Sequence, residues 1–416
     1  MKVYALRTTL AVAAFLSFAP VGALARGRDA DVRAGERRRQ LMRALSGSSY
    51  RAFYRAIEEL TVTGQMDGAA WRATVDGLWK QMDAMPRWER EHIHLSSRLV
   101  DALGAEGANP KGIVKILKTK ARNAEVYAGF VAALGRHGSA SRDVVSFLRD
   151  EVAHGNLPAT TTMRIRVVLA KLGFKSAKNT QAILSALRSQ EEEDRELKGE
   201  VARTMVLIRP GDWVSDELLK AMIDSLDEQN TSMAIALGLL GKRARPAVKK
   251  LKELNDDAHR RGSACEVAFT LALAQLDPRG RDAGLRRLFR QMASYWGRPI
   301  IVVCMDNTFV LVDEGMSKHL AGMLSDRGVQ GDAQFILANA GLQARAAVPE
   351  ALRFVVGTVD DEGRAGAAAL LAYIADYSRL PQLQAALRQV RAPRVRRSLE
   401  SAIESIRDLK SPTSDE

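Results

Sequence analysis

Six histidines and two cysteines are the residues of this 416-residue chain best suited to hold a metal or act as nucleophiles. His92 and His94 are two positions apart, so on a helix they point to different faces and cannot share one ion. The other four are scattered, at His137, His154, His259 and His319. These spacings do not predict a metal enzyme.

The sequence also lacks the short motifs that carry other chemistries. It contains no Gly-x-Ser-x-Gly nucleophile turn, no phosphate-binding loop and no dinucleotide fingerprint. We therefore predict no catalytic residues, no cofactor and no metal, and a protein that is not an enzyme.

Cys265 and Cys304 fall in segments that we expect to form helices in one layer of adjacent repeats. In an oxidising compartment the two could form a disulfide. The alternative is that both are small buried apolar residues. The sequence leaves both interpretations open.

The formal net charge is +13, and arginine outnumbers lysine. One interpretation is a bias in the coding sequence, without functional meaning. The other is an acidic partner, such as a nucleic acid, an anionic envelope polymer or an acidic protein. Charge raises attraction and encounter rates without naming the partner.

The first 25 residues have the layout of a secretory signal. A basic stretch from Met1 to Arg7 precedes an apolar run from Thr8 to Phe18, and Ala23-Leu24-Ala25 supplies small residues for signal peptidase. An uncleaved anchor is the alternative, but a membrane span needs roughly 20 apolar residues. We predict cleavage after Ala25, a bacterial periplasmic or secreted protein, and no later segment that spans a membrane.

Helix stops recur along the chain. The stops with glycine are Leu103-Gly104, Leu134-Gly135, Leu172-Gly173, Leu240-Gly241 and Ala340-Gly341, and those without are Arg209-Pro210, Leu276-Asp277-Pro278 and Ala375-Asp376. Glycine after a helix favours a left-handed cap, and proline cannot continue a helix. Their spacing gives a period of roughly 35 residues, which is typical of helical-pair repeats.

Two segments show the same unit most clearly. In the first, Pro246 opens a helix and Asn255-Asp256-Asp257 is expected to form the turn before a second helix. In the second, Asp360-Asp361 marks the corresponding turn. Apolar residues at helical spacing flank both turns, which predicts two short amphipathic helices in each unit.

These units resemble HEAT repeats of the phycobilisome-lyase-like class. The segment from Leu240 to Leu251 reads LGKRARPAVKKL, and the segment from Ala340 to Pro349 reads AGLQARAAVP. The family pattern is Leu-Gly, two variable residues and then Ala-x-Pro-Ala-Val-Pro-x-Leu. The first segment keeps the first proline of this pattern, and the second segment fits the same frame but keeps the second proline. The resemblance also implies that an arginine after the paired aspartates, such as Arg364, pairs with an aspartate of a neighbouring turn.

The resemblance and the Ala- and Leu-rich, aromatic-poor composition predict an all-α fold: an α-solenoid, or HEAT/armadillo-like superhelix, of about nine to ten antiparallel helix pairs. After the signal at 1–25, we expect an N-terminal helical cap at 26–100, HEAT-like repeats at 101–378, a C-terminal capping repeat at 379–409 and a disordered tail at 410–416. Residues 300–304 are β-branched, but the repeat register predicts a helix there.

The second helices of such repeats line the concave side. Nine arginines fall on segments that we assign to second helices: Arg90, Arg98, Arg164, Arg166, Arg203, Arg260, Arg261, Arg298 and Arg364. Either they form a basic groove, or they pair with acidic residues inside the scaffold.

The first functional hypothesis is a non-enzymatic binding or scaffold protein that presents a basic concave face to a protein or an anionic envelope polymer. The export signal argues against genomic DNA as the partner. The second is an enzyme on the same scaffold, similar to a chromophore lyase or a DNA glycosylase. The third is a structural subunit of an envelope complex.

Overall fold

The structure is a computed structural model that describes residues 21–47, 49–84, 97–105, 109–119, 124–138, 141–154, 157–174, 176–191, 194–295, 308–357 and 360–409. Within these ranges the chain is helical and contains no strand. The prediction of an all-α protein is therefore confirmed for this part of the chain.

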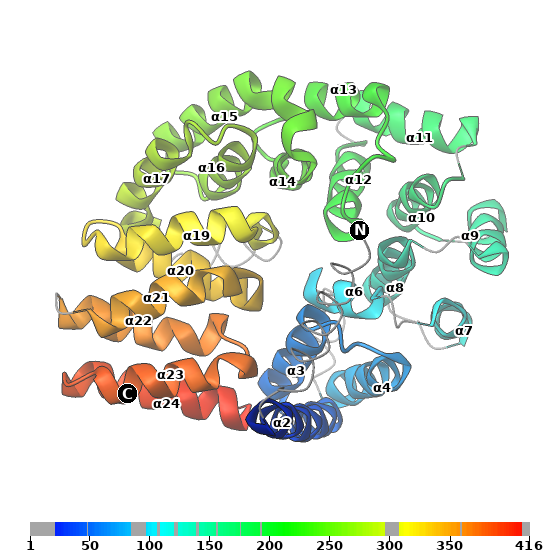
Figure 1. Ribbon diagram of the computed structural model, residues 1–416. Helices are drawn as coiled ribbons and strands as arrows, with labels where there is room; N and C mark the ends of the chain where they lie inside the picture. The colour runs from blue at the N-terminus through cyan, green and yellow to red at the C-terminus, as the bar shows by residue number, and fades with distance from the viewer. Residues whose placement is uncertain are drawn as a thin grey trace, which may run out of the picture.

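Helices of the first half lie in two layers (Figure 1). One layer is formed by α6 (Ser97–Leu103), α8 (Ala124–His137), α10 (Ala159–Lys171), α12 (Arg195–Ile208), α14 (Thr231–Leu240) and α16 (Cys265–Leu276). The other is formed by α7 (Pro110–Thr119), α9 (Arg142–His154), α11 (Ala177–Arg188), α13 (Asp216–Asp224), α15 (Val248–Arg261) and α17 (Arg281–Tyr295). Because each helix of the first layer is followed by a returning helix, the first-layer helices run in the same direction.

The second half continues this arrangement. It consists of α19 (Glu314–Gly322), α20 (Gln330–Ala340), α21 (Val348–Val356), α22 (Asp361–Ile374), α23 (Leu380–Gln389) and α24 (Pro393–Asp408). Four short 3-10 segments join them: η3 (Thr308–Leu311), η4 (Met323–Ser325), η5 (Gly341–Ala347) and η6 (Tyr377–Arg379). The first described helices are α2 (Val21–Ser46), α3 (Tyr50–Val62) and α4 (Gly68–Ala84).

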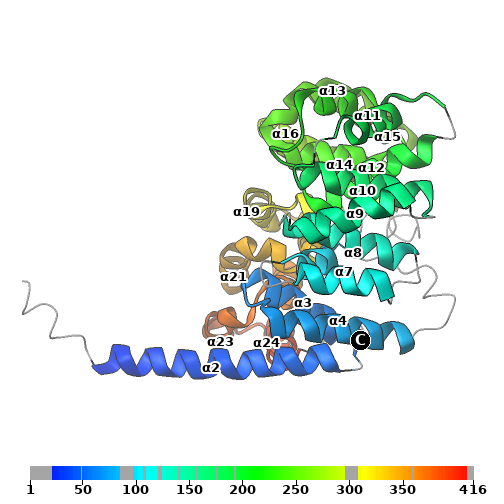
Figure 2. The same cartoon turned by 90° about the vertical axis from the view of Figure 1, so that its right-hand side faces the viewer.

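The first and the last described helices meet, so the helices close into a ring (Figure 1). Figure 2 shows α2 beside α23 and α24. The Arg55 side chain on α3 donates hydrogen bonds of 2.6 Å to the carbonyls of Tyr373 and Ala375 at the end of α22. In return, Arg345 on η5 donates to the Val62 carbonyl at 2.9 Å. The predicted N-terminal cap therefore contacts the last predicted repeats, and Arg37 on α2 also donates to the Arg407 carbonyl in the predicted C-terminal capping repeat at 3.1 Å.

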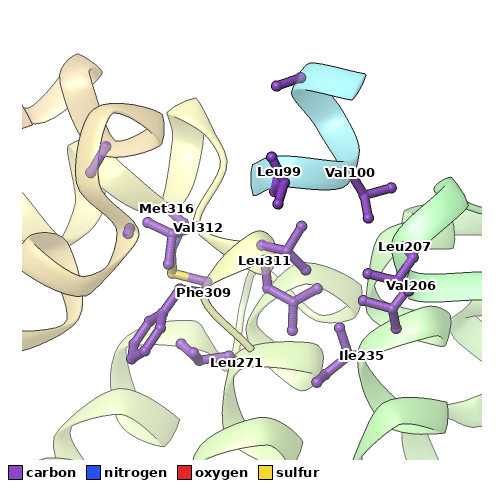
Figure 3. Packing of buried hydrophobic residues seen from close by; sticks show 14 of the residues in the cluster. Leu99, Val100, Val206, Leu207, Ile235, Leu271, Phe309, Leu311, Val312 and Met316 are labelled. Carbon is purple, nitrogen blue, oxygen red and sulfur yellow. The ribbon is translucent and has the colours of Figure 1, made fainter. Parts of the chain in front are cut away.

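Apolar side chains fill the middle of the ring near η3 (Figure 3). Leu311 on η3 lies among Ile235 of α14, Val206 of α12 and Leu99 of α6, and all four are at most 1% exposed. A Cβ on Gly238 would lie 2.8 Å from the Leu311 side chain and 3.1 Å from the Cα of Ala272, so glycine allows α14 to pack closely at this position. In this region the first layer encloses a packed core instead of an open channel.

Most predicted helix stops are confirmed. Helices end at Leu103, Lys171, Ile208, Leu240, Leu276, Ala340 and Ile374, each beside a predicted stop. Helix α22 also begins at the predicted turn, where Asp360 has a φ of 65°. The local sequence therefore determines where these helices end.

Two predicted boundaries are wrong. Gly135 lies inside α8, where a Cβ would be 2.9 to 3.0 Å from the side chains of Ile208 and Val168; the glycine serves close packing there. Likewise, Asn255-Asp256-Asp257 does not form a turn, because α15 continues to Arg261 and ends at Gly262 with a φ of 60°. The predicted helix at 300–304 lies outside the described residues.

The two HEAT-like units have the same local structure, 100 positions apart. Helix α14 is followed by Gly241 (φ 55°, ψ −131°), and helix α20 is followed by Gly341 (φ 60°, ψ −139°). Each glycine starts a seven-residue 3-10 segment: η2 (Gly241–Ala247) in the first unit and η5 in the second. The third residue after each glycine, Ala244 or Ala344, is fully buried. The shared motif thus produces a shared backbone that only glycine enters without strain.

We predict that Gly241→Ala and Gly341→Ala each lower the free energy of unfolding by about 1–3 kcal/mol, the cost of holding a non-glycine residue in a sparsely populated backbone region. Gly322→Ala is the matched control, because Gly322 is exposed, has ordinary helical dihedrals and has space for a Cβ. Chemical denaturation of the three variants measures the effect. Equal stability of all three would contradict the assignment of strain to the two repeat glycines.

Candidate anion-binding pocket

A pocket of about 310 Å³ lies between neighbouring helices α12 and α14. From α12 it is lined by Arg195, Lys198, Gly199 and Arg203, and from the start of α14 and the loop before it by Asp227, Gln229, Asn230, Thr231, Ser232 and Ile235. Three of these side chains are cationic, and one is a carboxylate.

Helical spacing places the cations of α12 on one face. Positions 195, 198, 199 and 203 are neighbours on the surface of a helix. Val201, Met205 and Ile208 are fully buried and fix the opposite face against the core. Gly199 has no atom within 4 Å of the position that a Cβ would occupy, so it leaves open space on the pocket side of α12.

The first turn of α14 contributes backbone donors. The Asn230 side chain caps the helix by accepting from the backbone N–H of Met233 at 3.1 Å. Thr231 and Ser232 line the pocket, and their N–H groups belong to the first turn, where no intrahelical acceptor exists. The positive end of the helix dipole adds to the field of the cations, so the pocket favours a negatively charged group.

Nearby carboxylates are already engaged. Glu200 is buried and accepts from Arg164 at 2.5 Å and from the Thr204 hydroxyl at 2.9 Å, and it pairs with Arg203 at 3.4 Å. Asp227 accepts the backbone N–H groups of Gln229 at 2.9 Å and Asn230 at 2.8 Å. No ion pair joins Lys198 to another described residue. The lining therefore contains more cationic than acidic side chains.

The nine arginines predicted for a concave face are distributed over several elements. Arg203 lines the pocket, and Arg164 lies beside it, 5% exposed and paired with Glu200. Arg166 donates to the Asn179 side chain at 3.0 Å. Arg90 and Arg298 lie outside the described residues, as does the side chain of Arg98.

The remaining three arginines pair locally. Arg260 and Arg261, in the last turn of α15, pair with Asp257, and Arg261 also pairs with Glu228. Arg364 is buried and donates to the Val355 carbonyl and to Asp361, both at 2.9 Å. These pairs correspond to the alternative in which arginines stabilise the scaffold, and they do not form a continuous basic groove.

The other predicted site residues remain untested. Cys265 is half-buried at the start of α16, and Cys304 lies outside the described residues, so the disulfide stays a prediction. Ala25 lies in the first part of α2, whose side chains are not described before position 34. Signal cleavage at Ala25 likewise stays a prediction.

Sequence reasoning missed Arg195 and Lys198. Their signal was present: together with Arg203 they follow a helical spacing on the polar face of a segment whose other face is apolar. What the sequence did not show is that the loop before α14 turns toward this face.

A second group of cations lies at the opposite ends of the first-layer helices. Asp101 on α6 pairs with Arg136 of α8 at 2.7 Å and with Arg209, directly after α12, at 3.0 Å. Lys171, at the end of α10, donates to the Ile208 carbonyl. Arg209 has a φ of 62°, and this left-handed backbone is uncommon for a non-glycine residue.

The negative ends of four helices meet here. Each helix C-terminus carries roughly half a negative charge, so α6, α8, α10 and α12 together offset the excess cations. Burial is the main factor that lowers the pKa of Lys171, to about 8, and the nearby Arg136 adds to the effect. We interpret this group as a structural joint between helices and not as a binding site.

Among the described residues, no three histidine, cysteine or carboxylate side chains gather as metal ligands. None of the described helices combines the length and apolar character needed to cross a membrane.

Comparison with known proteins adds no relative: no family model, no curated protein and no solved structure matches the chain.

We predict that the Lys171 amine titrates with a midpoint near 8. Because its pKa is lowered in the folded state, the unfolded chain holds this proton more tightly between about 8 and the ordinary lysine value of 10.5. In that window Lys171 makes the free energy of unfolding rise with pH. Trace acetylation across pH 7–11, followed by mass spectrometry, measures the midpoint.

Exposed lysines such as Lys220 provide the internal reference for that labelling experiment. A Lys171 midpoint above 10 would show that the amine is solvated, and would contradict the packed joint.

Proposed function

We propose that the protein is a non-enzymatic binding or scaffold protein that holds an anionic group of its partner in the pocket between α12 and α14. The observation that carries the proposal is the convergence of Arg195, Lys198 and Arg203 on the first turn of α14. Charge-assisted hydrogen bonds from such groups are stronger than neutral ones and suit carboxylate or phosphate. The partner is a protein or an anionic envelope polymer.

We also propose that the helix pairs are HEAT-type repeats of an α-solenoid. Support comes from the matched glycine, 3-10 segment and following helix of the two units, and from the two layers of successive helices. Such repeats present a preformed surface, so binding does not require a loop to lose conformational entropy.

Export is part of the same proposal. It rests on the basic, apolar and small-residue segments of the first 25 positions. We predict that protein expressed with its full N-terminus in a bacterial host is recovered from the periplasm or medium with Arg26 as its first residue. N-terminal sequencing measures this, and a cytoplasmic chain that retains Met1 would contradict export.

The pocket is tested with polyphosphate and polyglutamate as anionic probes, with binding measured by fluorescence anisotropy. We predict that Lys198→Gln weakens binding about ten-fold or more, because a hydrogen bond to a charged group contributes about 1.5–3 kcal/mol. Binding by the unmodified protein should also weaken between 10 mM and 150 mM salt, as expected from screening over about 30 Å and 8 Å respectively.

Gly199→Met is a second variant. It distinguishes loss of binding caused by a blocked pocket from loss of binding caused by misfolding. It places a side chain in the open space of the pocket while removing a glycine from a helix interior, which favours the helix by roughly 0.5–1 kcal/mol. We therefore expect lost binding at unchanged or higher stability.

Lys220→Gln is the matched control, since Lys220 is an exposed lysine on α13 and does not line the pocket. It removes the same charge as Lys198→Gln and should leave binding nearly unchanged. If all three variants bind the probes equally, attraction comes from net charge alone and the pocket is not the site.

A further inference from the structure

A second cavity, of about 530 Å³, lies where the two ends of the chain meet. The N-terminal side supplies Ala34, Arg37, Leu41, Glu59, Thr63 and Gln65, and the C-terminal side supplies Asp376, Tyr377, Ser378, Leu380, Pro381, Gln384 and Arg407. Its volume lies within the range of about 300–1,000 Å³ that is typical of small-molecule sites. None of these residues lines the α12–α14 pocket.

A buried ion pair forms one wall of this seam cavity. Arg37 and Glu59 are 4% and 2% exposed, and two hydrogen bonds of 2.8 and 2.7 Å join them. Arg37 also donates to the Arg407 carbonyl at 3.1 Å, and its guanidinium lies 4.6 Å from the centre of the Tyr377 ring. Because Glu59 neutralises Arg37, this wall offers no unpaired charge to a ligand.

The rest of the lining is mainly apolar in surface, with one additional cation, Arg407, and one carboxylate, Asp376. Asp376 accepts hydrogen bonds from the backbone N–H and the hydroxyl of Ser378. Leu41 and Leu380 are buried, and Tyr377 and Pro381 complete an apolar surface. Arg407 is exposed, and its side chain makes no ion pair with a described residue. An apolar cavity beside an exposed guanidinium is complementary to a molecule with an apolar chain and one anionic group.

We propose that the seam cavity binds a medium-chain carboxylate, with its alkyl chain against Leu41, Leu380 and Pro381 and its carboxylate near Arg407. This proposal is independent of the α12–α14 pocket, since the two sites share no residue.

Binding would also stabilise the closed ring. The cavity exists only while α2 and α3 contact η6, α23 and α24, so its ligand binds the closed form and not an opened one. A ligand shifts such an equilibrium according to its preference for one state. Occupancy should therefore protect the backbone amides on both sides of the seam from hydrogen exchange.

The test titrates the purified full protein with decanoate, and with 1-decanol as the uncharged analogue, by isothermal titration calorimetry. We expect saturable binding of both, with decanoate preferred. Ala34→Trp fills the cavity from an exposed position and should weaken both ligands about ten-fold or more. Ala69→Trp, at an exposed position of α4 that does not line the cavity, is the matched control and should change neither.

Arg407→Gln measures the contribution of the guanidinium charge to binding separately from that of the shape of the cavity. It should weaken decanoate about two- to five-fold, as expected for an exposed ion pair, and leave 1-decanol unchanged. Hydrogen exchange with and without decanoate should show new protection in α3 and α23 and none in α13.

Several outcomes would overturn the proposal. Absence of saturable binding removes the site, and equal binding by Ala34→Trp and the unmodified protein places the ligand elsewhere. If Arg407→Gln weakens the binding of decanoate and of 1-decanol equally, Arg407 does not bind the carboxylate, and the proposed ligand needs no anionic group. None of these results bears on polyphosphate binding, so this proposal and the proposed function can fail separately.

Discussion

The carbonyl groups at helix C-termini are the constraint on which this structure depends. A helix leaves its last four carbonyls without intrahelical donors, and its dipole places negative charge there. In a protein built from many short helices, such unpaired carbonyls occur at the end of each helix. Here it is met by lysine and arginine side chains that reach across from neighbouring helices.

Among the described helices, eight have such a cation at their C-terminal end. The donor and acceptor pairs are Lys80 to Ser46, Arg345 to Val62, Lys171 to Ile208, Lys250 to Ile223 and Asp224, Arg281 to Ala274, Arg364 to Val355, Arg55 to Tyr373 and Ala375, and Arg37 to Arg407. Three of the donors, Arg37, Arg55 and Arg345, join opposite ends of the chain. The same interaction that connects adjacent helices thus closes the ring, and part of the net charge of +13 is needed for it.

The sequence predicted local features better than long-range ones. Stops such as Leu240-Gly241 were predictable because they depend on the backbone preferences of a few residues. Gly135 was wrongly predicted as a helix stop because its role is close packing against Val168 and Ile208. These partners are distant in the sequence, so the residues next to Gly135 do not reveal them. Ring closure could not be predicted, because the contact between Arg345 and Val62 spans 283 positions and depends on curvature summed over every intervening helix. Arg203 was among the predicted binding residues, but its pocket required the position of the α14 loop.

The capping interaction also distinguishes structural cations from those that can bind a ligand. Arg136, Lys171 and Arg209 lie at helix C-termini, where the dipoles offset their charge. Arg195, Lys198 and Arg203 lie instead beside the N-terminus of α14, where the dipole has the same sign as the side chains. Gathering cations there costs free energy through mutual repulsion, and a bound anion would lower that cost. For this reason the position of a cation relative to the helix dipoles, and not the total charge, supports the pocket between α12 and α14 as the site of binding.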